Sequence, residues 1–216
     1  LLVSCGGPQA PNAPQAAVAS AASGAVAASA ATEPLPNDPD DPAIWVNAAD
    51  PSGSLIIGTD KQEGAGGLYV FGLDGRLRQA ITPMDRPNNV EVEYGLTLGR
   101  ASVDIAVATE RMKRRLRVFR IDRQSGRLDD ISSGGGLPVL EGMAGESGEP
   151  MGIALYKRPS DGAVFAVVAP KTGGARDYLW QYRLDDDGRG RVAGTLVRRF
   201  GNFSGVQAGA GEIEAI

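Results

Sequence analysis

Hydrophobic and polar residues alternate in short runs along most of this chain. From Pro34 onward the apolar runs are brief and are divided by Gly, Asp and Pro. No long segment repeats its apolar residues with the 3.6-residue period of an amphipathic helix. Short alternating runs between turn-forming residues indicate β-strands. The pattern therefore predicts an all-β fold made of many short strands.

Three segments of this pattern resemble one another. Each is a strand that ends in Leu-Asp or Ile-Asp, followed by a Gly-containing turn and then by Arg and an apolar residue, as in a β-hairpin. Their starts lie 48 and 63 residues apart, and the segments are LYVFGLDGRL from Leu68, LRVFRIDRQSGRL from Leu116 and LWQYRLDDDGRGRV from Leu179. Four-stranded propeller blades repeat at about 40 to 50 residues, and insertions lengthen some of them. The spacing predicts a β-propeller.

Charged residues recur at fixed places around each hairpin. The strand before each hairpin ends in a base, namely Lys61, Arg111 and Lys171. The strand before that one has acids at or near its start. Across the repeats these acids are Asp40 and Asp41, then Glu91, then Glu149, then Glu212 and Glu214.

Antiparallel pairing places these acids and bases on one face. The start of one strand and the end of the next lie at the same edge of a meander. One interpretation is a set of surface ion pairs that contribute little. The other is a site for a hard cation beside an anionic ligand, because carboxylates suit calcium and Lys and Arg suit phosphate oxygens.

Composition narrows the available chemistry. The chain of 216 residues has no histidine and one cysteine, which excludes histidine-based acid–base catalysis, imidazole metal sites, internal disulfides and thiolate clusters. A net charge of −4 gives no sign of nucleic-acid binding. Apolar residues make up 42% of the chain, enough for one large all-β core.

The beginning of the chain differs from the rest. The first 32 residues carry no charged side chain, and Leu2-Val3-Ser4-Cys5 resembles a bacterial lipobox. We therefore expect a lipidated Cys5 after a signal peptide that this sequence lacks, and an exported protein anchored at the cell envelope, periplasmic or extracellular. An ordinary buried or free cysteine is the alternative. Residues 1–36 are expected to form a flexible tether without a membrane span, and residues 37–216 the propeller domain.

Six motifs in order resemble the β-propeller phytase family. They are DPDDPAIW, NNVEVEYG, ATER, GIALY, APKTGG and GEIEAI, between residues 37 and 216. The resemblance implies a six-bladed propeller of which this chain holds about three blades, so we expect an N-terminal fragment. It also implies calcium-dependent release of phosphate from phytate, which is myo-inositol hexakisphosphate. The substrate would be the calcium complex of phytate, and a metal-bound water would attack phosphorus directly. The full-length protein would be a monomer.

The resemblance also carries roles over to individual positions. The residues that resemble calcium ligands or their neighbours are Asp40, Asp41, Glu91, Glu212 and Glu214, and those that resemble phosphate contacts are Lys61, Arg111 and Lys171. No catalytic side chain is assigned. The chain departs from the family pattern at Gln62, where a second lysine is frequent, and at Met151, where a tyrosine is common.

Other features have plainer interpretations. In RMKRRLRVFR, residues 111–120, we expect the bases to line the solvated side of a strand, except for Arg111, which we expect exposed at a loop mouth. Trp45 and Trp180 are expected in the core. The rival to a phytase is a non-catalytic propeller lipoprotein that binds a partner or a glycan through the same face.

Overall fold

A computed structural model describes residues 28–174, 176–202, 213 and 216 of the chain. The described strands form three antiparallel sheets. The first sheet contains β1 (Pro39–Trp45), β2 (Leu55–Asp60), β3 (Gly66–Gly72) and β4 (Leu77–Met84). The second contains β5 (Pro87–Leu98), β6 (Ala101–Glu110), β7 (Arg115–Ile121) and β8 (Leu128–Asp130), with β9 (Leu137–Pro138) paired to β7. The third contains β10 (Pro150–Lys157), β11 (Val164–Pro170), β12 (Arg176–Asp186) and β13 (Val192–Asn202).

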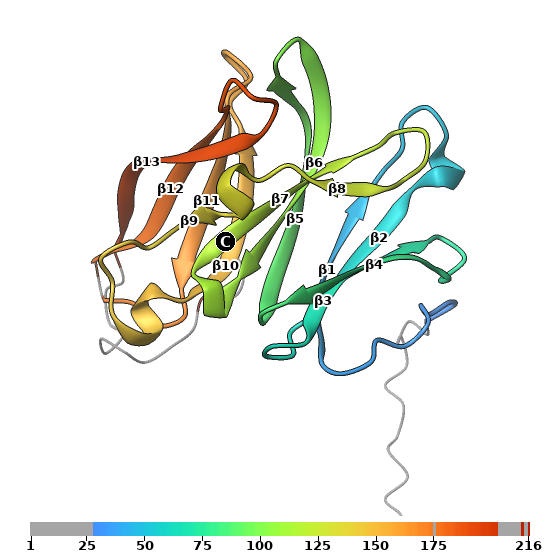
Figure 1. Ribbon diagram of the computed structural model, residues 1–216, viewed down its shortest axis with the longest axis horizontal. Coiled ribbons are helices and arrows are strands. Elements are labelled where there is room, and N and C mark those ends of the chain that lie inside the picture. Colours follow the sequence, from blue (N-terminus) through green and yellow to red (C-terminus); the bar gives the residue numbers. More distant parts are fainter. Residues whose placement is uncertain (1–27, 175, 203–212, 214–215) are drawn as a thin grey trace, which may run out of the picture.

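Each sheet contains a meander of four consecutive strands, to which the second sheet adds β9, and the sheets stand side by side as blades 1, 2 and 3 (Figure 1). The first strands of the blades meet at the centre, where β5 contacts both β1 and β10. Meanders arranged in this way around their innermost strands define a β-propeller. The predicted all-β propeller and its three repeats are confirmed.

Helical structure is confined to four short 3-10 turns in the described part of the chain. They are η1 (Pro51–Gly53), η2 (Arg111–Lys113), η3 (Ser133–Gly135) and η4 (Gly145–Gly148). A bilayer-spanning helix needs about 20 apolar residues. None of the described helices is long and apolar enough for that.

The predicted hairpins form the outer half of each blade. Between β3 and β4, Asp74 accepts a hydrogen bond from the backbone N–H of Arg76, and Gly75 adopts a φ of +76° that favours glycine. In blade 2 the carboxylate of Asp122 accepts the backbone N–H groups of Gln124 and Ser125. An aspartate that holds its own turn explains why each hairpin segment carries Asp at the strand end.

One irregularity recurs at the start of all three blades. The pairing of the first and second strands shifts register just after a proline, between Pro39 and Pro42, Pro87 and Val90, and Pro150 and Ile153. The residue before each proline accepts the backbone N–H of the base that follows the second strand. The three bonds are Lys61 to Asp38 at 2.9 Å, Arg111 to Arg86 at 3.1 Å and Lys171 to Glu149 at 2.8 Å. We call positions 38, 86 and 149 the strand entrances.

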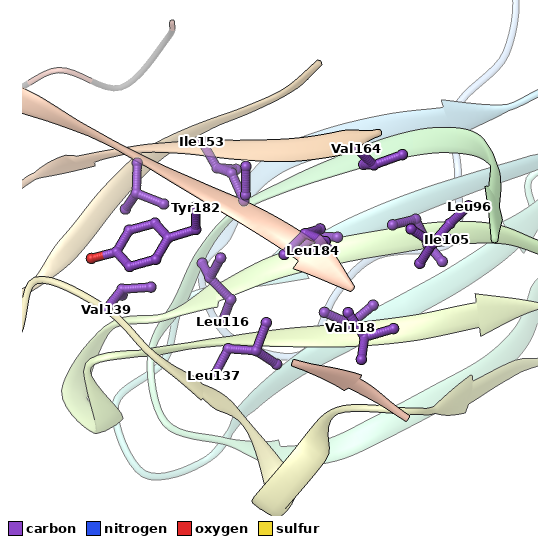
Figure 2. Packing of buried hydrophobic residues seen from close by; sticks show 14 of the residues in the cluster. Leu96, Ile105, Leu116, Val118, Leu137, Val139, Ile153, Val164, Tyr182 and Leu184 are labelled. Carbon is purple, nitrogen blue, oxygen red and sulfur yellow. The ribbon is translucent and has the colours of Figure 1, made fainter. Parts of the chain in front are cut away.

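The core lies between blades rather than within them. Strand β6 is apolar on both faces because Ile105 and Val107 pack toward blade 3, whereas Ala106 and Ala108 pack toward blade 1. Figure 2 shows the cluster between blades 2 and 3, in which Leu116 and Leu184 take part. Trp45 and Trp180 are 1% and 3% exposed, as predicted. Each pair of neighbouring blades is thus joined by its own apolar layer.

The segment before β1 contacts blade 1. The backbone N–H of Glu33 donates to the carbonyl of Gly75 at 2.8 Å, and the Glu33 carboxylate accepts the N–H of Leu77 at 2.9 Å. The end of the segment that we expected to be a tether therefore lies on the β3–β4 hairpin. Cys5 lies outside the described residues.

Candidate functional site

The structure brings the three predicted bases to equivalent places on one face. Lys61, Arg111 and Lys171 directly follow β2, β6 and β11. Each is fixed by the backbone bond to its strand entrance described above. The predicted placement of these side chains at one edge of the blades is confirmed. Their surroundings differ between the two blade junctions.

At the junction of blades 1 and 2, Lys61 lies among polar side chains. Its ammonium group is 2.7 Å from a carboxylate oxygen of Asp40. The other carboxylate oxygen of Asp40 lies 3.4 Å from the side-chain nitrogen of Asn88. Asn88 is 1% exposed, and its side-chain oxygen has no hydrogen-bond partner among the described residues. A buried amide oxygen without a partner is a position at which a cation or a donor would be favourable.

Two predicted metal ligands lie next to each other at the same junction. The carboxylate of Asp41 on β1 accepts the backbone N–H of Val90 on β5 at 2.9 Å. Burial, and then the negative charge of Asp41, raise the pKa of the neighbouring Glu91. Two carboxylates that disfavour each other's charge form an arrangement that a bound cation would relieve.

A threonine connects the two blades beneath these carboxylates. The hydroxyl of Thr59, which is fully buried, accepts the backbone N–H of Asp41 at 3.0 Å and donates to the carbonyl of Asn88 at 2.6 Å. Thr109 repeats the arrangement one blade later. Its hydroxyl accepts the backbone N–H of Asn89 at 3.1 Å and donates to the carbonyl of Met151 at 3.4 Å. Sequence reasoning missed both threonines. Their only signal was a Thr two residues before the base in the first two repeats.

The junction of blades 2 and 3 is built around a buried ion pair. The Nε of Arg111 lies 3.0 Å from a carboxylate oxygen of Glu149, with side chains 4% and 17% exposed. The prediction that Arg111 is exposed was wrong, because the charge of Glu149 allows this arginine to be buried. Lys171 lies 3.5 Å from the more exposed Glu146.

The basic run after β6 was also only partly interpreted correctly. Arg115 and Arg117 are partly buried and pair with the nearly inaccessible carboxylate of Glu110, and Arg117 also pairs with Asp130. Arg114 is exposed, but its guanidinium donates to the carbonyls of Met143 and Gly145. The run therefore fixes the loops around blade 2 and is not simply a solvated strand face.

The remaining predicted acids do not all reach this face in the described structure. Glu212 and Glu214 lie outside the described residues, and no group of three His, Cys, Asp or Glu side chains suited to a metal occurs in the parts that are described. The register places Asp40, Asn88 and Met151 at equivalent positions, so only blade 1 has a carboxylate there. Asp40, Asp41, Glu91 and the side-chain oxygen of Asn88 are oxygen donors, the ligand type that calcium prefers, but the three carboxylates alone do not form a group suited to a metal in the described structure.

A hollow at the opposite ends of the same strands has a different character. It measures about 390 Å³ and is lined by Trp45, Asp104, Arg123 and Lys157 among others. Asp104 accepts the indole N–H of Trp45 at 3.1 Å and is paired with Arg123, and the Lys157 ammonium donates to the carbonyl of Tyr94 at 2.8 Å. Because these charged groups have partners within the protein, the hollow is a weaker candidate for a ligand site.

Comparison with known proteins identifies the family of this chain. A family model described as Phytase matches residues 2–210. A 3-phytase of Bacillus subtilis (strain 168) is 34% identical over 162 residues, which is 74% of this chain and 39% of that protein. The protein is thus a β-propeller. It belongs to the phytase family, and the chain spans about 39% of the length of that relative.

Proposed function

We propose that the protein is a calcium-dependent phosphomonoester hydrolase that releases phosphate from phytate. Membership of the phytase family and the name of the Bacillus relative support this reaction. The observation that carries the proposal is the junction of blades 1 and 2, where Lys61 pairs with Asp40, and burial and then the charge of Asp41 raise the pKa of Glu91. Such a junction favours a cation and a phosphate together.

The chain's own residues would divide the work by charge. Asp40, Asp41 and Glu91, with Glu212 and Glu214, would hold the calcium ion. When bound, that ion supplies Lewis-acid activation of the phosphate ester and of water. Lys61, Arg111 and Lys171 would bind phosphate oxygens and compensate the negative charge of a calcium–phytate substrate.

The two kinds of base suit different contacts. An ammonium group has three N–H donors, so Lys61 can donate to a phosphate oxygen while Asp40 keeps its place. The Nε of Arg111 is held by Glu149, which orients the plane of its guanidinium. Arg111 would therefore offer a phosphate only its η nitrogens, in one fixed direction.

The test of the proposal is phosphate release from phytate by the purified protein. We expect release with calcium, and loss of release together with a lower melting temperature after chelation, because a ligand bound only by the native state stabilises it by mass action. The alternative is a non-catalytic propeller that binds a partner or a glycan through the same face. Calcium-independent stability and no release under any metal condition would favour that alternative.

A lipid anchor on Cys5 is a separate part of the proposal. The lipobox-like Leu2-Val3-Ser4-Cys5 supports it, and it implies a protein at the cell envelope. The monomeric state that we propose for the full-length protein rests on the family resemblance instead. Replacing Cys5 with Ser should move the protein from the membrane fraction to the soluble fraction of the envelope. An unchanged membrane fraction would contradict lipidation, and neither result bears on the phosphatase.

A further inference from the structure

Arg86 occupies the strand entrance of blade 2 and has a backbone conformation that is rare for its type. Its φ is +55°, in the left-handed region that residues other than glycine, asparagine and aspartate seldom adopt. The N–H of Arg86 donates to the carbonyl of Gln62 at 3.3 Å, and its carbonyl accepts the N–H of Arg111 at 3.1 Å. The backbone of Arg86 is thus fixed between the residue after Lys61 and Arg111.

The position of Arg86 directs its side chain to the preceding blade. At the equivalent entrance of blade 3, Glu149 extends to Arg111 of blade 2. Arg86 likewise extends to the β2–β3 loop of blade 1, where its Nη1 lies 3.6 Å from the carboxylate of Glu63. This loop begins with Lys61 and Gln62. The guanidinium of Arg86 therefore lies on the same face as the proposed phosphate contacts.

The hydrogen bonding of this guanidinium is incomplete. The Nε of Arg86 is buried and has no hydrogen-bond partner among the described residues. Its ion pair with Glu63 is long, and the Glu63 side chain is 59% exposed, so this pair contributes little. A buried donor without an acceptor is unfavourable unless a ligand supplies the acceptor.

The other bases at the junction are better compensated. Lys61 lies 2.7 Å from Asp40, and Lys113 lies 3.1 Å from Asp85. The carboxylate paired with Arg86 in the described part of the chain is the exposed Glu63, at 3.6 Å. The weakly compensated charge, the unpaired Nε and the strained backbone coincide in one residue, a combination that is typical of a ligand site.

We propose that Arg86 binds a phosphate group of the ligand at the junction of blades 1 and 2, as a further phosphate contact beside Lys61. Arginine binds an oxyanion with two parallel N–H donors, and Nε with one η nitrogen forms such a pair. This inference rests on the proposed function, because it concerns one phosphate of a substrate with several. Contact with Arg86 would select substrates that carry a second phosphate close enough to the one held by Lys61 for both residues to bind at once.

The test measures binding of myo-inositol hexasulfate, a non-hydrolysable polyanion, by calorimetry at fixed salt and calcium. We expect Arg86→Gln to weaken binding about tenfold or more, since one charge-assisted pair is lost. Arg86→Lys keeps the charge but not the paired donors, so it should recover only part of the affinity. Arg100→Gln is the matched control, because Arg100 is an exposed arginine in the turn between β5 and β6.

A melting curve without ligand separates binding from folding. Because Nε of Arg86 has no partner to lose, Arg86→Gln should melt at the wild-type temperature or above. The inference is wrong if wild type does not bind the hexasulfate, if Arg86→Gln binds as tightly as wild type, or if its weaker binding is matched by Arg100→Gln or by a lower melting temperature.

Phosphate release distinguishes this inference from the proposed function. If the protein hydrolyses phytate and the Arg86→Gln variant binds the hexasulfate as tightly as wild type, the proposed function stands and the role of Arg86 is wrong. If the protein never releases phosphate but binds the hexasulfate through Arg86, the anion site stands and the proposed function is wrong.

Discussion

The two blade junctions of this propeller have the same backbone and opposite electrostatics. At both, a threonine connects neighbouring first strands and a base follows the second strand. Between blades 2 and 3 the buried Arg111 is paired with Glu149. Between blades 1 and 2, burial and then the charge of Asp41 raise the pKa of Glu91, and both Asn88 and Arg86 have buried polar atoms without hydrogen-bond partners among the described residues.

This difference indicates where the ligand belongs. Natural sequences satisfy their buried polar groups, and the exceptions concentrate at functional sites. At the junction of blades 2 and 3 the buried Arg111 already has Glu149 as a partner, so this pair stabilises the fold in addition to the phosphate contact that we propose for Arg111. The junction of blades 1 and 2 has buried polar atoms without partners among the described residues, and these favour the cation and the anion that we propose there.

The largest effect is expected from Glu149→Ala. It leaves Arg111, whose side chain is 4% exposed, as a buried charge without its partner. Removing one member of a buried pair typically costs about 3–5 kcal/mol. Urea unfolding measures the loss, and the added change Arg111→Ala should recover part of it. The matched control is Asp161→Asn, which breaks an exposed pair with Arg158 and should cost far less than Glu149→Ala. Equal losses in the two single variants would refute the role given to this pair.

A smaller effect is expected from Asp104→Asn, at the end of blades 1 and 2 that faces away from the site. Burial opposes ionisation of Asp104, but hydrogen bonds from Arg123, Trp45 and Gly95 outweigh it and lower its pKa. The stabilisation of the fold by the ionised Asp104 is therefore fully present at pH values above the ordinary aspartate pKa of 3.8, and it is lost as the pH falls below that value. We expect a loss of about 2 kcal/mol at pH 7 that shrinks on acidification. A loss independent of pH would show that the charge of Asp104 is not the cause.

Next in size are the two threonine connections. Thr59→Val removes the hydroxyl that bonds Asp41 and Asn88, and leaves a buried N–H and a buried carbonyl without that partner. We expect a loss of about 1–2 kcal/mol. Thr109→Val should cost less, because the bond from Thr109 to Met151 is longer, at 3.4 Å. Thermal unfolding of both variants tests this order, and a larger loss for Thr109→Val would reverse it.

The smallest effect, and the one most specific to the proposed cation, is expected from Glu91→Gln. Neutralising Glu91 removes its repulsion with Asp41, so the calcium-free protein should be more stable by about 0.5 kcal/mol. The stabilisation by added calcium should fall at the same time. Glu93→Gln, a neighbouring change on β5, is the control. An unchanged calcium shift in Glu91→Gln would contradict a role for Glu91 as a ligand.

Much of this picture could be predicted from the sequence. The Asp/Gly turns and short apolar runs predicted the hairpins, and the recurring bases predicted the face that carries Lys61, Arg111 and Lys171. These features are local, and each repeat carries its own copy. The pairing of Arg111 with Glu149 was missed because it depends on how blade 3 packs against blade 2.

Arg86 escaped sequence reasoning for a different reason. The strand entrances carry three different residues, Asp38, Arg86 and Glu149, so the position does not stand out as a repeat. The signal that could have found it is the proline that follows in each case, at Pro39, Pro87 and Pro150. Aligned on these prolines, the three repeats place a base only in blade 2, opposite a loop that already carries Lys61.

The most direct test of the central claim is a crystal structure of the protein with calcium and myo-inositol hexasulfate. We predict one sulfate within hydrogen-bonding distance of Lys61, another within hydrogen-bonding distance of Arg86, and a calcium ion in contact with Asp41 and Glu91, all at the junction of blades 1 and 2. A polyanion bound instead in the hollow beside Asp104 and Lys157, with Asp41 and Glu91 free of metal, would contradict it.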